Sequence, residues 1–213
     1  MNNIDKIILS LCGGTGSWER PYKEAGYNVI NVTLPEYDVL KIYANEENII
    51  LKEMTSIKTK SVYGILAAPP CTMFSFARVR AKKPRDFNEG LLCVDACLRI
   101  IRQCMLSRSL KFWCMENPRG YLRQFMGKPC FTFQPYEFSK DGSEMYSKPT
   151  ELWGYFNLPK KLPTSDLLKK VAGSFNSGNW WWVKSNRKKG LSWKEHTAKT
   201  PYFFAEAFFK ANK

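Results

Sequence analysis

The sequence predicts a mixed α/β fold built around a mostly parallel sheet. Short, almost entirely apolar runs cover residues 6–11, 62–68 and 110–115, and runs of this kind are typical of strands buried on both faces of a parallel sheet. Between the last two runs, residues 88–108 carry apolar side chains at three- and four-residue intervals. This spacing predicts an amphipathic helix that returns the chain across the sheet.

The other elements follow in chain order. A short helix over residues 18–25 and a second strand over 27–34 should come after the first strand, and no structure is predicted for residues 44–61. The helix over 88–108 is expected to bury Leu91, Val94, Leu98, Ile101 and Met105. A short helix over 119–126, strands over 130–134 and 150–156, and a phenylalanine-rich helix over 201–211 complete the domain.

Composition limits the class of protein. A chain of 213 residues fits a single domain, 1–213, and 33 basic against 19 acidic residues give a net charge of +14, which favours nucleic acid as partner. The seven cysteines are odd in number and contain no CxxC pair, which argues against a disulfide framework and a zinc site. With no long apolar run, we expect a cytoplasmic protein without membrane or metal partners, and a monomer is favoured.

A glycine-rich turn follows the first strand. The sequence Cys12-Gly13-Gly14-Thr15-Gly16 leads directly into the first expected helix. Glycine lets the backbone approach a ligand closely, and a helix N-terminus offers free N–H groups, so the turn is a candidate nucleotide-binding site. The spacing is not G-x-G-x-x-G and lacks a P-loop lysine, which disfavours dinucleotides and ATP. An ordinary tight turn between strand and helix is the alternative.

Cys71 lies just beyond the carboxyl end of the strand over 62–68. Pro69 and Pro70 end that strand, because proline cannot donate to the ladder, and ligands of open α/β sheets bind beyond such strand ends. Five basic residues follow without an intervening acid: Arg78, Arg80, Lys82, Lys83 and Arg85. This loop would favour a reactive thiolate and contact phosphates, whereas the alternative is a cysteine used only for packing.

A carboxylate marks the end of the next expected strand. Glu116, Asn117 and Pro118 follow the run over 110–115, and proline should again end the strand. An acid here, beside a thiol on a neighbouring strand, is more specific than either residue alone. The alternatives are a surface acid or a helix cap. Farther on, Trp180, Trp181 and Trp182 precede a basic cluster, which indicates either base stacking or a hairpin packed on the domain.

Taken together, these motifs resemble the DNA cytosine-5 methyltransferases, and specifically their small phage- and prophage-type members. The likeness spans most of residues 5–160 and is carried by the segments LCGGTGSW, VTLPEYDV, LAAPPCTMFSFAR, LKFWCMENPRGYLRQFMGKP and KPTELWGYF. The resemblance implies a Rossmann-like class I methyltransferase fold with helices on both faces of the sheet. It also implies methyl transfer from S-adenosylmethionine to carbon 5 of cytosine in double-stranded DNA, with the target base flipped out of the stack.

The resemblance assigns roles to individual residues. Cys71 would attack carbon 6 of the base and Glu116 would bind ring nitrogen 3. It implies contacts with the cofactor for Cys12, Gly13, Gly14, Thr15, Gly16, Trp18, Thr33, Asp38 and Pro69, with Asp38 expected at the adenine edge. It implies contacts with DNA for Pro70, Ser75, Arg78, Arg80, Asn117, Pro118 and Lys148. A phage-encoded enzyme would act in the cytoplasm of its bacterial host.

The chain departs from the family pattern in three places. Thr33 and Leu34 stand where an acid would hold the cofactor ribose, and Lys148-Pro149-Thr150 replaces the later glutamine–arginine–arginine motif. Residues 160–195 leave room for only a reduced target-recognition segment. The same chemistry on RNA or a cytidine nucleotide is therefore one alternative, and a catalytically silent nucleic-acid-binding protein with a methyltransferase fold is another.

Overall fold

A six-stranded, mostly parallel sheet forms the centre of the protein. The computed structural model describes residues 3–76, 78, 81–163, 173–174 and 198–213. The strands are β1 (Ile7–Leu11), β2 (Asn28–Val32), β6 (Val62–Ala67), β7 (Phe112–Pro118), β8 (Phe131–Phe133) and β10 (Thr150–Tyr155). They lie in the order β2-β1-β6-β7-β10-β8, and only β10 runs against the others. The predicted mixed α/β class is confirmed.

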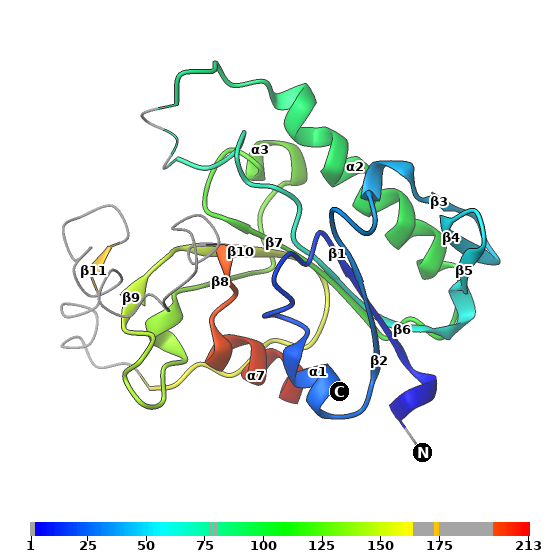
Figure 1. Ribbon diagram of the computed structural model, residues 1–213. Helices are drawn as coiled ribbons and strands as arrows, with labels where there is room; N and C mark the ends of the chain where they lie inside the picture. Colours follow the sequence, from blue (N-terminus) through cyan, green and yellow to red (C-terminus); the bar gives the residue numbers. More distant parts are fainter. Residues whose placement is uncertain (1–2, 77, 79–80, 164–172, 175–197) are drawn as a thin grey trace.

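Helices cover both faces of this sheet (Figure 1). They are α1 (Arg20–Glu24), α2 (Phe87–Met105), α3 (Arg123–Met126) and α7 (Tyr202–Ala211), and short 3-10 turns occupy Asn3–Asp5, Val39–Lys41, Thr59–Ser61 and Pro135–Glu137. The apolar side chains of α2 pack with those of β1 and β6 in one cluster. Those of α1 and α7 pack on the opposite face in a second cluster, so the sheet is buried between two helical layers.

A small antiparallel sheet occupies the region for which no structure was predicted. It consists of β3 (Tyr43–Ala44), β4 (Asn48–Lys52) and β5 (Thr55–Lys58), in that order. Ile49, Leu51 and Ile57 point into the cluster formed with α2, while neighbouring residues are exposed. This inward–outward alternation is the pattern of strands with one buried face. A two-stranded parallel pair, β9 (Tyr146–Ser147) with β11 (Gly173–Ser174), lies outside the main sheet.

The buried face of α2 differs from the predicted one. Val94 and Ile101 are buried as predicted, but Met105 is 56% exposed, and the fully buried positions include Cys97, Ile100 and Cys104. Small side chains and thiols pack closely against the sheet and count as apolar surface, so the stripe that contacts β1 and β6 is rotated away from the larger residues. Cys97 and Cys104 thus contribute to packing against the sheet.

Strand β7 is longer than predicted, because it continues past Met115 and ends at Pro118. Beyond the pair Ala67–Met115, β7 has lost its neighbour β6 but still pairs with β10, where Pro118 lies opposite Thr150. A proline is tolerated where only one edge of a strand remains hydrogen-bonded. Glu116 and Asn117 are therefore held within a strand and not in a loop.

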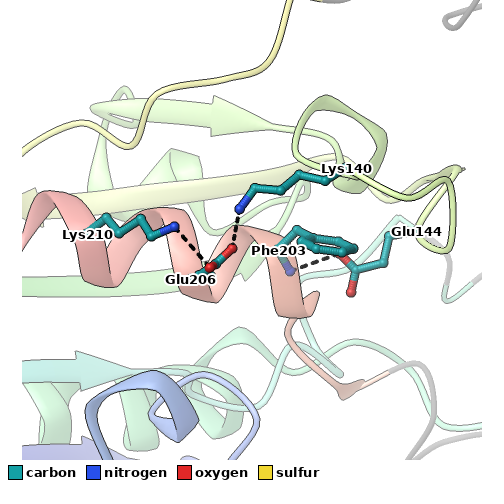
Figure 2. A network of polar contacts seen from close by, with 5 residues as sticks. All are labelled: Lys140, Glu144, Phe203, Glu206 and Lys210. Carbon is teal, nitrogen blue, oxygen red and sulfur yellow. Dashed lines mark hydrogen bonds and ion pairs between the residues drawn. The ribbon is translucent and has the colours of Figure 1, made fainter. Parts of the chain in front are cut away.

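The C-terminal helix α7 is fastened to the connection between β8 and β10 (Figure 2). The Glu144 carboxylate accepts hydrogen bonds from the backbone N–H groups of Tyr202 and Phe203, which lie in the first turn of α7. Farther along the helix, Glu206 forms ion pairs with Lys140 and Lys210. Glu144 thus provides the N-terminal cap that Pro201, at the N-cap position, lacks.

Candidate functional site

The strand ends that carry Cys71 and Glu116 are neighbours in the sheet. Strands β6 and β7 run parallel, with Ala67 opposite Met115. The carboxyl ends of both strands therefore lie at the same edge of the sheet. The side chain of Asn117 donates a hydrogen bond of 2.9 Å to the carbonyl of Pro69. Asn117 is 1% exposed, and this buried bond fixes the proline pair to the carboxylate-bearing strand.

The loop that begins at Cys71 is fastened to the loop that follows β7. The carbonyl of Cys71 accepts from the backbone N–H groups of Phe74 at 2.9 Å and Ser75 at 2.8 Å, which closes a tight turn. Ser75 then forms an antiparallel bridge with Gly120, and the N–H of Tyr121 donates to the Phe74 carbonyl. A β-carbon on Gly120 would lie 2.3 Å from that carbonyl, so the close approach requires glycine.

Two of the basic residues after Cys71 form contacts within the protein, Arg85 with backbone carbonyls and Lys83 in an exposed ion pair. The Arg85 guanidinium donates to the carbonyls of Met73 at 2.7 Å and Ser75 at 2.8 Å, and it lies 4.8 Å from the Tyr121 ring centre. Lys83 pairs with Glu89 at 2.5 Å. Arg85 therefore holds the loop in shape through its bonds to backbone carbonyls.

The surroundings of Glu116 change the pKa of its carboxyl group. It stands opposite Leu152 of β10, and its Oε2 atom is buried with no hydrogen-bond partner among the described residues. Burial raises the pKa of Glu116, and the positive charge of Lys148 opposes that shift. The fold thus brings the charge of Lys148 to bear on the half-buried side chain of Glu116.

The turn after β1 has a backbone that requires glycine at several positions. Gly14 and Gly16 have positive φ angles of 55° and 72°, and Cys12, at 56°, shares this left-handed conformation. A β-carbon on Gly13 would lie 2.2 Å from Ser10 Oγ and 2.6 Å from Asn31 Oδ1. The Cys12 N–H donates to the Val32 carbonyl at 2.8 Å, which ties the turn to β2.

A group of buried polar side chains surrounds this turn. Glu19 is fully buried, and its Oε2 accepts a hydrogen bond of 3.1 Å from Ser10 Oγ. Three buried polar atoms here have no partner within the described part of the chain: Trp18 Nε1, Glu19 Oε1 and Asn31 Oδ1. Burial raises the pKa of Glu19. Unpaired buried polar atoms are uncommon, and one donor with two acceptors suits a ligand that carries both a carboxylate and an ammonium group.

Sequence reasoning included Trp18 but missed Glu19 and Asn31. The available signal was an acid directly after the glycine turn, at a position where a helix begins. Asn31 gave none, because a polar residue in an apolar strand normally points to solvent. Here it pairs in register with Ser10 on the neighbouring strand, so both side chains lie on the same face beneath the turn.

The residues after β2 form two short turns. Asp38 Oδ1 accepts from the Leu40 N–H at 3.0 Å and caps the following 3-10 turn, while Thr33 closes a turn through its carbonyl. A hydrogen bond from Cys97 lowers the pKa of Cys12; burial and the Asp38 carboxylate oppose the effect. The Asp38 carboxylate thus acts electrostatically on Cys12, the first residue of the glycine turn.

Other predicted residues are distributed as follows. Pro69 is buried, Pro70 and Thr15 are exposed, and Arg78 is half-buried. Arg80 and most of the segment 160–195, with its three tryptophans, fall outside the described residues. Within residues 3–163 and 198–213, where described, no helix is long and apolar enough to cross a membrane, and no group of three or more potential ligands is arranged to hold a metal.

Comparison with known protein families finds no family model that matches the chain, and comparison with curated proteins finds no matching relative.

Proposed function

We propose that the protein methylates carbon 5 of cytosine in DNA, with S-adenosylmethionine as methyl donor. The observation that carries this proposal is the buried hydrogen bond from Asn117 to Pro69. It joins the loop containing Cys71 to the strand end containing Glu116, the two groups on which the chemistry depends. The mostly parallel sheet with helices on both faces is compatible with a Rossmann-like methyltransferase fold.

The reaction needs a nucleophile and an acid at one sheet edge. Attack of the Cys71 thiolate on carbon 6 forms a carbon–sulfur bond and gives carbon 5 the character of an enamine. Glu116, in its protonated form, would donate a hydrogen bond to ring nitrogen 3 and so favour this attack. Transfer of the methyl group to carbon 5 would break its bond to the donor sulfur and leave S-adenosylhomocysteine. A base would then take the carbon-5 proton, and expulsion of the thiolate would restore the aromatic base and free Cys71.

The residues around the glycine turn would hold the methyl donor. The turn allows the backbone to approach the ligand, and Glu19 with Asn31 offers acceptors for the ammonium group of its amino-acid end. Trp18 Nε1 offers a donor for its carboxylate. These contacts would compensate for the acid that is absent from the end of β2, where Thr33 stands.

A catalytically silent binding protein is the competing function. The missing acid and the missing arginine motif favour it, whereas the raised pKa of Glu116 favours catalysis, because perturbed acids concentrate at reactive sites. RNA or a cytidine nucleotide as substrate would keep the same residues in the same roles.

Transfer of labelled methyl to unmethylated duplex DNA tests the proposal. We expect label in DNA cytosine, its loss in Cys71→Ala, and its retention in Cys130→Ala, a control that removes an exposed thiol elsewhere. Label in RNA alone would change the substrate and keep the chemistry. Activity in folded Cys71→Ala would exclude the thiol mechanism, and no label in either nucleic acid would favour the silent binding protein.

A further inference from the structure

Two adjoining cavities run along the edge strand β8. One has a volume of about 540 Å³ and the other about 410 Å³, and they share Arg123 and Thr132. We call their common surface the β8 groove and define it by its four basic residues: Arg119, Arg123, Lys128 and Lys161.

The charge of the β8 groove is positive even after its internal pairs are counted. Arg123 pairs with Glu151, and Lys161 pairs with Glu137 at 2.8 Å. Those are the two acids that line the cavities, so the four cations outnumber them. Such an excess attracts a polyanion, and a single small anion would need only one of these cavities.

The pairs also fix the groove in place. Glu151 is 1% exposed, so it holds the Arg123 guanidinium at a defined position on the edge of α3. The ammonium of Lys161 donates to the Thr132 carbonyl at 2.7 Å as well as pairing with Glu137. Arg119 and Lys128 are both exposed at the ends of this arrangement, where their charges can meet a ligand that extends beyond either cavity.

The groove is continuous with the strand end that carries Glu116. Arg119 directly follows Pro118, the last residue of β7, and its N–H donates to the Pro149 carbonyl at 2.8 Å. Pro149 lies next to Lys148, whose charge acts on Glu116. A strand of nucleic acid with one base at Glu116 would therefore have its neighbouring phosphates at the entrance to the groove.

We propose that the β8 groove binds the sugar–phosphate backbone of the DNA that flanks the target base. This inference rests on the proposed function and adds to it the face of the protein over which the DNA lies. The contacts would be electrostatic and would not depend on base sequence, because phosphates carry the charge and the groove residues are cationic.

Charge reversal at the exposed ends of the groove tests this placement. The double variant Arg119→Glu/Lys128→Glu is compared with the control Lys58→Glu/Lys60→Glu, which makes the same change of charge on exposed residues at β5. Binding of a fluorescent unmethylated duplex is measured between about 50 and 300 mM salt, a range over which phosphate contacts weaken steeply. Calorimetric binding of S-adenosylmethionine and the melting temperature show whether each variant keeps its fold.

We expect the groove variant to bind the duplex at least about tenfold more weakly, and the slope of log affinity against log salt to fall by about 2, since each phosphate contact contributes about 0.9. The control should change affinity less than about threefold by general charge alone. Equal losses in both variants, or none in the groove variant, would overturn the placement while wild-type binding leaves the proposed function standing. No binding of duplex by the wild type would overturn both.

The milder pair Arg119→Gln/Lys128→Gln provides a second measurement if charge reversal prevents folding. Its expected loss of affinity is smaller than that of the reversal, because it removes the positive charges without adding repulsion, and the expected fall in slope is the same. An unchanged slope in this folded variant would again overturn the placement.

Discussion

Replacing Asn117 should show how much the hydrogen bond between β7 and the loop before Cys71 contributes to stability. Asn117→Ala removes the donor to the Pro69 carbonyl, and that carbonyl belongs to a buried residue. A buried acceptor left without its partner costs about 1–3 kcal/mol. Loss of Asn117 Oδ1, which is buried without a partner among the described residues, offsets part of this cost. We expect a net loss of about 2 kcal/mol, or about 4–8 °C in melting temperature for a chain of this size.

Asn117→Asp sharpens the test because it keeps the shape and changes the chemistry. An ionised aspartate side chain at this position would present a carboxylate to the Pro69 carbonyl and donate nothing. Its destabilisation at pH 8 should therefore exceed that of Asn117→Ala by about 1 kcal/mol or more. The difference should shrink as the pH falls, because a protonated carboxyl can donate.

Thermal unfolding followed by circular dichroism at pH 5 and pH 8 measures both effects. The control is Asn88→Ala, an exposed position on α2, which should change stability by less than about 0.5 kcal/mol. Methyl transfer should fall in both Asn117 variants, since Pro69 lies two residues before Cys71. Melting temperatures within about 1 °C of wild type for both would refute the view that this bond holds the loops together, a limit well below the roughly 4 °C expected.

Three further results are expected. Glu19→Gln should weaken S-adenosylmethionine binding in calorimetry by about tenfold or more and leave 5′-methylthioadenosine, which lacks the amino-acid end, unaffected; equal losses would contradict an ammonium contact. Because burial raises the pKa of Glu116 above its ordinary 4.5, its stabilising contribution is complete below that value and declines as the pH rises through the raised pKa. In urea unfolding, the free energy of unfolding of Glu116→Gln should thus rise relative to that of the wild type as the pH increases. Parallel plots of this free energy against pH for the two proteins would argue against the raised pKa. Glu144→Ala should cost about 1–2 kcal/mol by uncapping α7, against less than about 0.5 kcal/mol for Lys210→Ala, whose ion pair is exposed; similar effects would place little weight on the cap (Figure 2).

The sheet was predictable because each of its strands carries its own local signal. Apolar runs locate β1, β6 and β7, and the glycine and proline residues at their ends locate the turns. Pairing with a distant strand is not a local property, which is why the extension of β7 through Pro118 was missed: it depends on β10, some thirty residues later. The small sheet β3–β5 was missed for a similar reason, since its strands are short and polar on one face.

For the site as well, the sequence locates residues with a local signal and misses those that depend on contacts with distant residues. The sequence places Cys71 and Glu116 at strand ends, and the parallel pairing of β6 and β7 brings those ends to one edge. It does not reveal that Arg85 turns back to the carbonyls of its own loop, because an arginine in a basic run looks the same whether it meets phosphate or backbone. Glu19 was likewise hidden, since burial of an acid depends on Ser10 and on the turn above it.

The contact between Ser17 and Thr200 limits the order in which parts of the protein can form during synthesis. Ser17 Oγ, in the segment between the glycine turn and α1, accepts a hydrogen bond of 2.9 Å from the Thr200 N–H, across 183 positions of sequence. Tyr22 of α1 reaches still farther, to the carbonyl of Asn212. During synthesis these two contacts can form only after residues 200–212 have been made, long after the glycine turn itself. Until then the glycine turn is held by its contacts with β2, such as the bond from the Cys12 N–H to the Val32 carbonyl, and a ligand that depends on the contacts of Ser17 and Tyr22 can be captured only after α7 has formed.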